Sequence, residues 1–245
     1  MYRNHALNMD SKYCLGGVQM DDKEKQLKQK KKDFIEMLGK RNVFFNLPNE
    51  TKDDMIRRVI RIVPTKTSIY RTSRGLGSVC NNVKQAAKAE VYSYLFEQIK
   101  SIFNKSDLTQ ESYKKWFEDT CEELTKRFNN KISSSCNGGA SRYLTLGHAQ
   151  KWISMAMKYF YCSDLFDFNF DYCYCPIDNI IIEKALEKQS ESGKPKNLKG
   201  LVKPISWSKI GRISVLRDIY SDIDAIIEQN NLNCTQLEFD VLNWQ

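Results

Sequence analysis

The chain has 245 residues and a formal net charge of +8 at pH 7, from 38 lysines and arginines against 30 aspartates and glutamates. Hydrophobic residues make up 41% and charged residues 28%, as in a soluble globular protein with a substantial core, and five prolines and eleven glycines favour helices over a β-sandwich. No apolar run approaches the roughly 20 residues that span a bilayer, which excludes a membrane-spanning class, and the basic balance favours a polyanionic partner.

The N-terminal part is predicted to be a flexible basic tail, residues 1–32, that ends in a lysine-rich run with one apolar residue, 23–32. Such a run is usually a solvated helix start or tail, and the alternative is an arm that binds phosphate. The remainder, 33–245, is predicted to form a single helical domain, with two lobes, 33–130 and 141–245, as the alternative.

The first strong amphipathic pattern predicts a helix over 51–63, with Thr51 as its N-cap and Pro64 as its end. Arginines cluster on the side opposite its apolar stripe, and the irregular segment 65–78 that follows is also basic. We interpret both as candidate nucleic-acid contacts, although a solvated face also explains the arginines. The candidate residues are Arg57, Arg58, Arg61, Lys66, Arg71 and Arg74.

Apolar spacing predicts further helices, and the alternation in 166–172 predicts a short strand or an extended strap. The predicted helices span 86–103, 111–128, 146–161, 176–188 and 213–227. The fold class is therefore mostly α, a compact multi-helix globular protein with at most one short β element. The expected core includes Ile56, Val59, Leu95, Ile99, Trp116, Phe117, Trp152, Ile153, Phe160, Ile181 and Ile223.

The eight cysteines contain no C-x-x-C pair, and the pair Cys173 and Cys175 cannot by itself close a tetrahedral site. We therefore expect no metal and no cofactor. The polar N-terminus shows no signal peptide, so a cytoplasmic protein with free thiols and no membrane partner is expected.

One lysine and one aspartate stand at predicted helix starts, Lys151 and Asp178. The positive end of a helix dipole disfavours a second positive charge, which favours a neutral, nucleophilic amine at Lys151. The turn before it, 146–149, would present backbone N–H groups to a phosphate. The alternative is that Lys151 and Lys158 form the solvated face of a helix whose other side packs on the core.

Two short motifs resemble the helix-hairpin-helix DNA glycosylases, the 8-oxoguanine branch in particular. Leu-Gly-His-Ala-Gln-Lys151 is similar to the G-h-G-x-K turn, with Ala149 in place of the second glycine, and Cys-Pro-Ile-Asp178 is similar to the P-h-D-x-x-h motif. The resemblance covers about 146–185. It implies a base-excision glycosylase with lyase activity that acts on DNA, in which Lys151 attacks the sugar C1′ of a flipped nucleotide, Asp178 assists, and Gly147 and His148 lie in the phosphate-binding turn.

Two other functions fit the same residues. Arg142 and His148 match the loose R-x4–6-H pattern of the all-helical HEPN ribonucleases, in which an arginine and a histidine act on RNA. The third interpretation is a non-catalytic helical module that binds nucleic acid or protein, with Lys151 and Asp178 purely structural. The base recognised, the strand state of the substrate and the oligomeric state leave no signature in the sequence.

Overall fold

A computed structural model of the protein describes residues 22–40, 50–67, 69–73, 76, 79–134, 143–191, 199–201 and 206–244. Within these ranges the chain forms α-helices and short 3-10 turns and no strand, so the prediction of a mostly α fold is confirmed. The α-helices are α1 (Asp22–Lys40), α2 (Lys52–Lys66), α3 (Ile69–Thr72), α4 (Asn81–Phe103), α5 (Gln110–Ser133), α6 (Leu146–Ser163), α7 (Asn179–Glu191), α8 (Ile213–Gln229) and α9 (Gln236–Asn243). The 3-10 turns are η2 (Phe170–Tyr172) and η3 (Trp207–Lys209).

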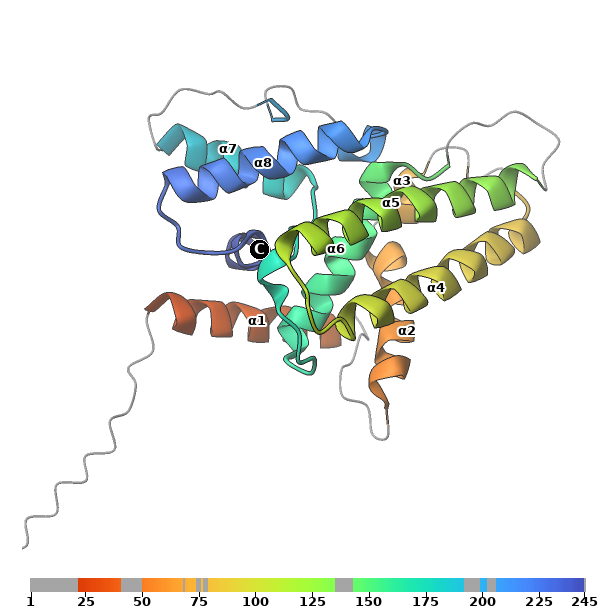
Figure 1. Ribbon diagram of the computed structural model, residues 1–245, viewed down its shortest axis with the longest axis horizontal. Helices are drawn as coiled ribbons and strands as arrows, with labels where there is room; N and C mark the ends of the chain where they lie inside the picture. The colour runs from red at the N-terminus through yellow and green to blue at the C-terminus, as the bar shows by residue number, and fades with distance from the viewer. Residues whose placement is uncertain are drawn as a thin grey trace, which may run out of the picture.

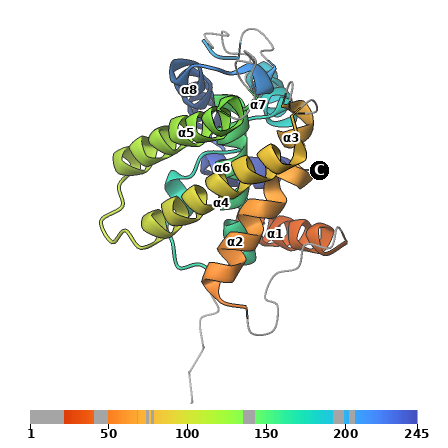
Figure 2. The same cartoon turned by 90° about the vertical axis from the view of Figure 1, so that its right-hand side faces the viewer.

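Helix α6 lies at the centre of the molecule (Figure 1), and it packs against α1, α2 and α5 and against the η3 turn. The long helices α4 and α5 run side by side, and α2 packs against a different side of α4 (Figure 2). The buried apolar side chains of the described residues form one continuous cluster. All the expected core residues lie in that cluster except Trp116, which is only partly buried at its edge.

The central position of α6 corrects one expectation about its polar side. Lys151 and Lys158 lie away from the apolar stripe, yet both are buried, with 10% and 1% of their side chains exposed. Other elements cover this side of α6, so it is not a solvated face. Burial of lysine is unfavourable unless the ammonium has a partner, and each of the two has one, as described below.

Helix α2 begins as predicted with a capping box between Thr51 and Asp54, but it continues through Pro64 to Lys66. Proline lacks the N–H that would bond the carbonyl four residues earlier, which is that of Ile60. The indole Nε1 of Trp152 donates to this carbonyl at 2.9 Å. An α6 side chain therefore satisfies the group that the proline leaves unpaired, and Pro64 does not end the helix.

The terminal segments of the described chain pack together. Residues 22–32, predicted as part of a flexible tail, belong to α1, which packs against α6 and α9, whereas 1–21 lie outside the described residues. Phe34 of α1 makes edge contacts with Tyr159 and Trp244 at ring-centroid distances of 5.3 and 5.2 Å. The prediction of a tail over 1–32 is therefore wrong for its last third.

The alternating segment 166–172 is an extended strap that ends in the η2 turn. Its phenylalanines pack on Phe103 at the end of α4 and on Phe160 of α6. Alternation reports only that successive side chains face opposite sides, and a strap that lies on a helical core satisfies the same pattern as a strand.

Candidate functional site

The structure brings Lys151 and Asp178 together. The Nζ atom of Lys151 lies 3.0 Å from Oδ2 of Asp178, and 22% of the aspartate side chain is exposed against 10% of the lysine side chain. The ammonium also lies 4.5 Å from the ring centroid of Trp207. These residues come from three separate segments, so only the folded chain creates the pair.

The two carboxylate oxygens of Asp178 have different partners. Oδ1 accepts the backbone N–H of Ile181 at 3.1 Å, which makes Asp178 the N-cap of α7, one residue before the helix proper. Oδ2 accepts from Lys151. These two bonds fix the orientation of the Asp178 carboxylate.

A buried glutamine on α6 positions Asp178. The Gln150 amide donates from Nε2 to the carbonyl of Ile177 at 2.8 Å, and its Oε1 accepts the Ile177 N–H at 3.0 Å. Tyr220 of α8 donates its hydroxyl to the same Oε1 at 3.1 Å. This two-point contact with Ile177, the residue before Asp178, was not predicted, because nothing in the local pattern distinguishes this glutamine from a surface residue.

Three amides of the turn before Lys151 are already bonded within the protein. The N–H of Gly147 donates to the carbonyl of Ile210 at 3.0 Å, and the amides of His148 and Ala149 bond to Thr145. A Cβ at Gly147 would lie 1.8 Å from the carbonyl oxygen of Trp207, so glycine is needed here for the close approach of the η3 turn. Of the expected phosphate cradle at 146–149, the amides of Gly147, His148 and Ala149 are therefore bonded to the protein's own groups.

The position of Lys151 also differs from expectation. It lies in the second turn of α6, beyond the first turn where the helix dipole acts most strongly. Its amine lies instead beside the Asp178 carboxylate and the Trp207 ring.

His148 is buried, with 1% of the residue exposed. Its Nδ1 accepts the N–H of Thr145 at 3.2 Å, and its Nε2 lies 3.1 Å from the hydroxyl of Thr72. Burial, assisted by the nearby charge of Lys151, lowers the pKa of the imidazole to about 4. His148 is therefore a neutral structural residue near pH 7, which argues against the general acid–base role of the ribonuclease interpretation, and Arg142 lies outside the described residues.

This histidine makes the stability of the protein depend on pH. The pKa of the imidazole is near 6.5 in the unfolded chain and about 4 in the folded protein. As the pH falls, the unfolded chain therefore binds a proton first, and folding stability is lost between about pH 6.5 and about pH 4. The loss reaches about 3 kcal/mol only below about pH 4, where the imidazole is protonated in both the folded and the unfolded chain. The His148→Gln variant lacks this effect, so denaturant unfolding should show that its stability deficit relative to the wild type shrinks as the pH falls from 7 to 4. A deficit that does not change with pH would contradict the assignment.

A second buried Lys–Asp pair lies two turns along α6. Lys158 Nζ lies 2.7 Å from Oδ2 of Asp240 on α9, with 1% and 11% of the two side chains exposed. Desolvation raises the pKa of Asp240, and the ammonium of Lys158 partly offsets that effect. The aromatic rings of Phe34 and Trp244 cover the lysine. This pair holds α9 and α1 on α6, and it differs from the pair at Lys151 in being more deeply enclosed.

The predicted nucleic-acid residues of α2 divide into two groups. Arg57 and Arg61 are exposed one turn apart, and the Arg57 guanidinium lies 3.5 Å over the ring of Phe96. Arg58 is instead bound through Nε and Nη2 to both oxygens of Glu50 at 2.7 Å, so its charge is locally neutralised. Lys66 is exposed at the end of α2, and the side chain of Arg71 and all of Arg74 lie outside the described residues.

Two tryptophans come near Lys151, Trp152 in the sequence and Trp207 in the folded chain. Trp152 is fully buried between Tyr70 and Tyr92, so its ring is not available to a ligand. Trp207 covers Lys151 and makes an edge contact with His148 at a centroid distance of 5.4 Å. Of the two, Trp207 is the one that adjoins the Lys–Asp pair.

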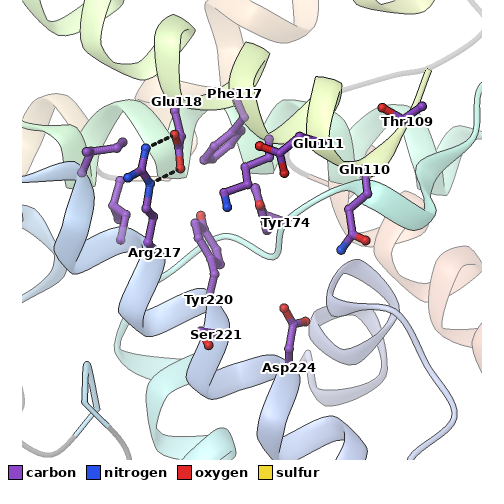
Figure 3. A pocket seen from close by; sticks show the side chains of 13 residues that line it. Thr109, Gln110, Glu111, Phe117, Glu118, Tyr174, Arg217, Tyr220, Ser221 and Asp224 are labelled. Carbon is purple, nitrogen blue, oxygen red and sulfur yellow. Dashed lines mark hydrogen bonds and ion pairs between the residues drawn. The ribbon is translucent and has the colours of Figure 1, made fainter. Parts of the chain in front are cut away.

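A cavity of about 580 Å³ lies between α5 and α8, apart from these residues. Figure 3 shows Arg217 facing Glu118 across it, and the guanidinium binds both carboxylate oxygens at 2.6 Å. Lys114 is the other basic residue of the lining, against two further carboxylates, Glu111 and Asp224. Burial raises the pKa of Asp224, although Gln236 donates a hydrogen bond to it. This acidic balance makes the cavity unfavourable for phosphate.

The described residues contain no group of three histidine, cysteine, aspartate or glutamate side chains that could hold a metal ion. Burial raises the pKa of the Cys173 thiol to about 12, which disfavours the thiolate that a metal would need. In the same part of the chain, no helix combines the length and apolar character required to cross a bilayer.

Comparison with known proteins finds no matching family model, no similar curated protein and no similar solved structure. The function proposed below therefore depends on the geometry of the Lys151–Asp178 pair.

Proposed function

We propose that this protein is a DNA-acting enzyme of the base-excision glycosylase and lyase type, in which Lys151 is the nucleophile and Asp178 assists it. The observation that carries the proposal is the contact between Lys151 Nζ and Asp178 Oδ2 at 3.0 Å. A lysine amine paired with an oriented carboxylate is a suitable arrangement for attack on an electrophilic carbon. The net charge of +8 is consistent with a polyanionic substrate.

The reaction follows from the chemistry of the two groups. The Lys151 ammonium gives a proton to Asp178, and its freed electron pair forms a bond to the sugar C1′. The C1′–N bond to the base breaks, and the base leaves with the electrons of that bond and takes the proton from Asp178, which becomes a carboxylate again. The nitrogen now bound to C1′ gives up one of its two protons, O4′ takes up a proton as the C1′–O4′ bond breaks, and the nitrogen lone pair completes the C=N bond of a Schiff base between Lys151 and the sugar. The regenerated Asp178 carboxylate stabilises the positive charge that develops on the sugar, because its orientation is already set by the α7 cap and by Gln150.

Access to the amine requires a local movement. The Trp207 ring lies over Lys151, and a nucleotide has to displace it before the amine can reach C1′. The η3 turn is held to α6 through the hydrogen bond from Gly147 to Ile210. The same ring, once displaced, is available for stacking on a flipped base.

The test is borohydride trapping with DNA that carries an abasic site or 8-oxoguanine. Reduction of a Schiff base leaves a permanent secondary amine, which peptide mass spectrometry can locate. An adduct on Lys151 supports the proposal. An adduct on another lysine or on the N-terminal amine refutes the assignment of Lys151, and the absence of any adduct refutes the reaction.

The non-catalytic alternative is supported by a specific observation, the Lys158–Asp240 pair. It is a buried pair of the same chemical type on the same helix, and it has a structural role. If trapping fails and salt-dependent binding of DNA remains, the protein is a nucleic-acid-binding module in which Lys151 and Asp178 fasten α7 to α6.

A further inference from the structure

A groove of about 370 Å³ lies between α2 and α4, where the two helices pack together (Figure 2). Arg57 and Arg61 of α2 line one side, and Lys88 of α4 lines the other. Arg57 and Arg61 are four residues apart, so they project from the same face of α2. Lys88 was not among the predicted nucleic-acid residues, because the sequence does not reveal that it faces the α2 arginines.

The charge of the groove has one sign. Its lining contains three basic side chains and no carboxylate. Asp54, which interacts with Arg57, is also held in the capping box by Thr51. Three positive charges converging on one hollow attract an anion with several oxygens, in contrast to the cavity between α5 and α8, whose carboxylates repel one.

Two of the three cationic side chains lie over neighbouring aromatic rings. The Arg57 guanidinium lies over Phe96, and Lys88 Nζ lies 4.5 Å from the ring centroid of Tyr70. Such contacts restrict the long side chains without neutralising them. Their N–H groups therefore remain available to phosphate oxygens, and less rotamer entropy is lost on binding.

We propose that this groove binds the phosphate backbone of a nucleic-acid strand, with Arg57, Arg61 and Lys88 as the phosphate ligands. The inference rests on the proposed function in that the partner is DNA, but it concerns residues that take no part in the reaction. Arg58 is excluded from the site, because its guanidinium is bound to Glu50.

The groove is joined to the helix that carries Lys151. Ile60 and Tyr92 line it, and both contact Trp152 of α6, through the indole hydrogen bond to the Ile60 carbonyl and an edge contact between rings at 5.8 Å. Trp152 directly follows Lys151. A strand held in the groove is therefore anchored to the element that positions the nucleophile.

The test uses the full chain and two variants of equal net charge. Arg61→Gln/Lys88→Gln removes two groove cations, and Lys105→Gln/Lys115→Gln removes two exposed cations at the opposite end of the α4–α5 pair. Binding of single- and double-stranded oligodeoxynucleotides is measured by fluorescence anisotropy between 50 and 200 mM salt. Each lost phosphate contact lowers the duplex salt slope by about 0.9, so the groove variant should lose about 1.8 units of slope. Its affinity should fall about tenfold per contact, as expected for a charge-assisted hydrogen bond.

Equal slopes for the groove variant and the control variant would overturn the proposal, because the effect would then be one of net charge alone. Inorganic phosphate titrated against the protein provides a second arm. Saturable phosphate binding that the groove variant loses, without any loss of oligonucleotide affinity, would assign the groove to a small anion and also overturn the proposal.

The outcome is separable from the reaction at Lys151. The groove variant should need a higher DNA concentration for half-maximal formation of the borohydride adduct, whereas the control variant Lys105→Gln/Lys115→Gln should react as the wild type does. If the wild type forms no adduct but the groove variant still loses salt-dependent binding, the reaction proposal fails and the groove proposal stands. If the adduct forms and the variant binds as the wild type does, the reverse holds.

Discussion

The Lys151→Ala variant should lose borohydride trapping and strand cleavage by at least about 10³-fold, since removal of a nucleophile eliminates the covalent route altogether. The fold should survive, because the partner left behind is a partly exposed carboxylate that still caps α7. We expect a stability loss of only about 1–2 kcal/mol. The measurement is single-turnover trapping at saturating DNA, with denaturant unfolding of the same sample.

Two companion variants sharpen this result. Asp178→Asn retains an oxygen for the Ile181 N–H and removes the charge, so it should bind DNA and fold normally but react about 10²–10³-fold more slowly. Lys184→Ala removes a half-buried lysine of α7 that pairs with Glu187, and it should react like the wild type. Trapping that persists in Lys151→Ala would show that another amine is the nucleophile.

The Asp240→Ala variant should lose about 3–5 kcal/mol of folding stability, the largest stability effect that we expect from any single substitution here. It leaves the Lys158 ammonium, only 1% exposed, without its carboxylate inside the core. The loss should be measured by chemical denaturation at pH 7, and it should be accompanied by release of Trp244 from Phe34, visible in tryptophan fluorescence.

An apolar replacement of both partners provides the decisive comparison. Lys158→Met/Asp240→Leu removes both charges, so it should recover most of the lost stability or exceed the wild type. Asp119→Ala, which breaks the exposed pair with Lys115, should cost no more than about 0.5 kcal/mol. A cost of less than about 1 kcal/mol for Asp240→Ala would mean that water reaches Lys158 and that α9 is not held by this pair.

Lys151 and Lys158 also show which features of α6 the local sequence pattern predicts and which it does not. The apolar stripe of α6 was predicted correctly, because a helix with a core-facing side repeats apolar residues at 3.6-residue spacing. The same pattern placed Lys151 and Lys158 on a solvated face. Periodicity reports only the hydrophobic side of a helix, and it cannot show that other segments cover the polar side as well.

The sequence did not predict α1, α3 and α9 as helices. By itself it determined the approximate bounds of α2 and α4 to α8, most of the core, and the position of Asp178 at a helix start. These follow from spacing, capping residues and proline, whose effects act within a few residues. Only the tertiary structure decided four other features: the contact of Lys151 with Asp178, the neutral state of His148, the bonded amide of Gly147, and the pairing of Arg58 with Glu50. The physical reason is that hydrogen-bond partners and desolvation depend on which segments meet in space, and that information is spread over the whole chain.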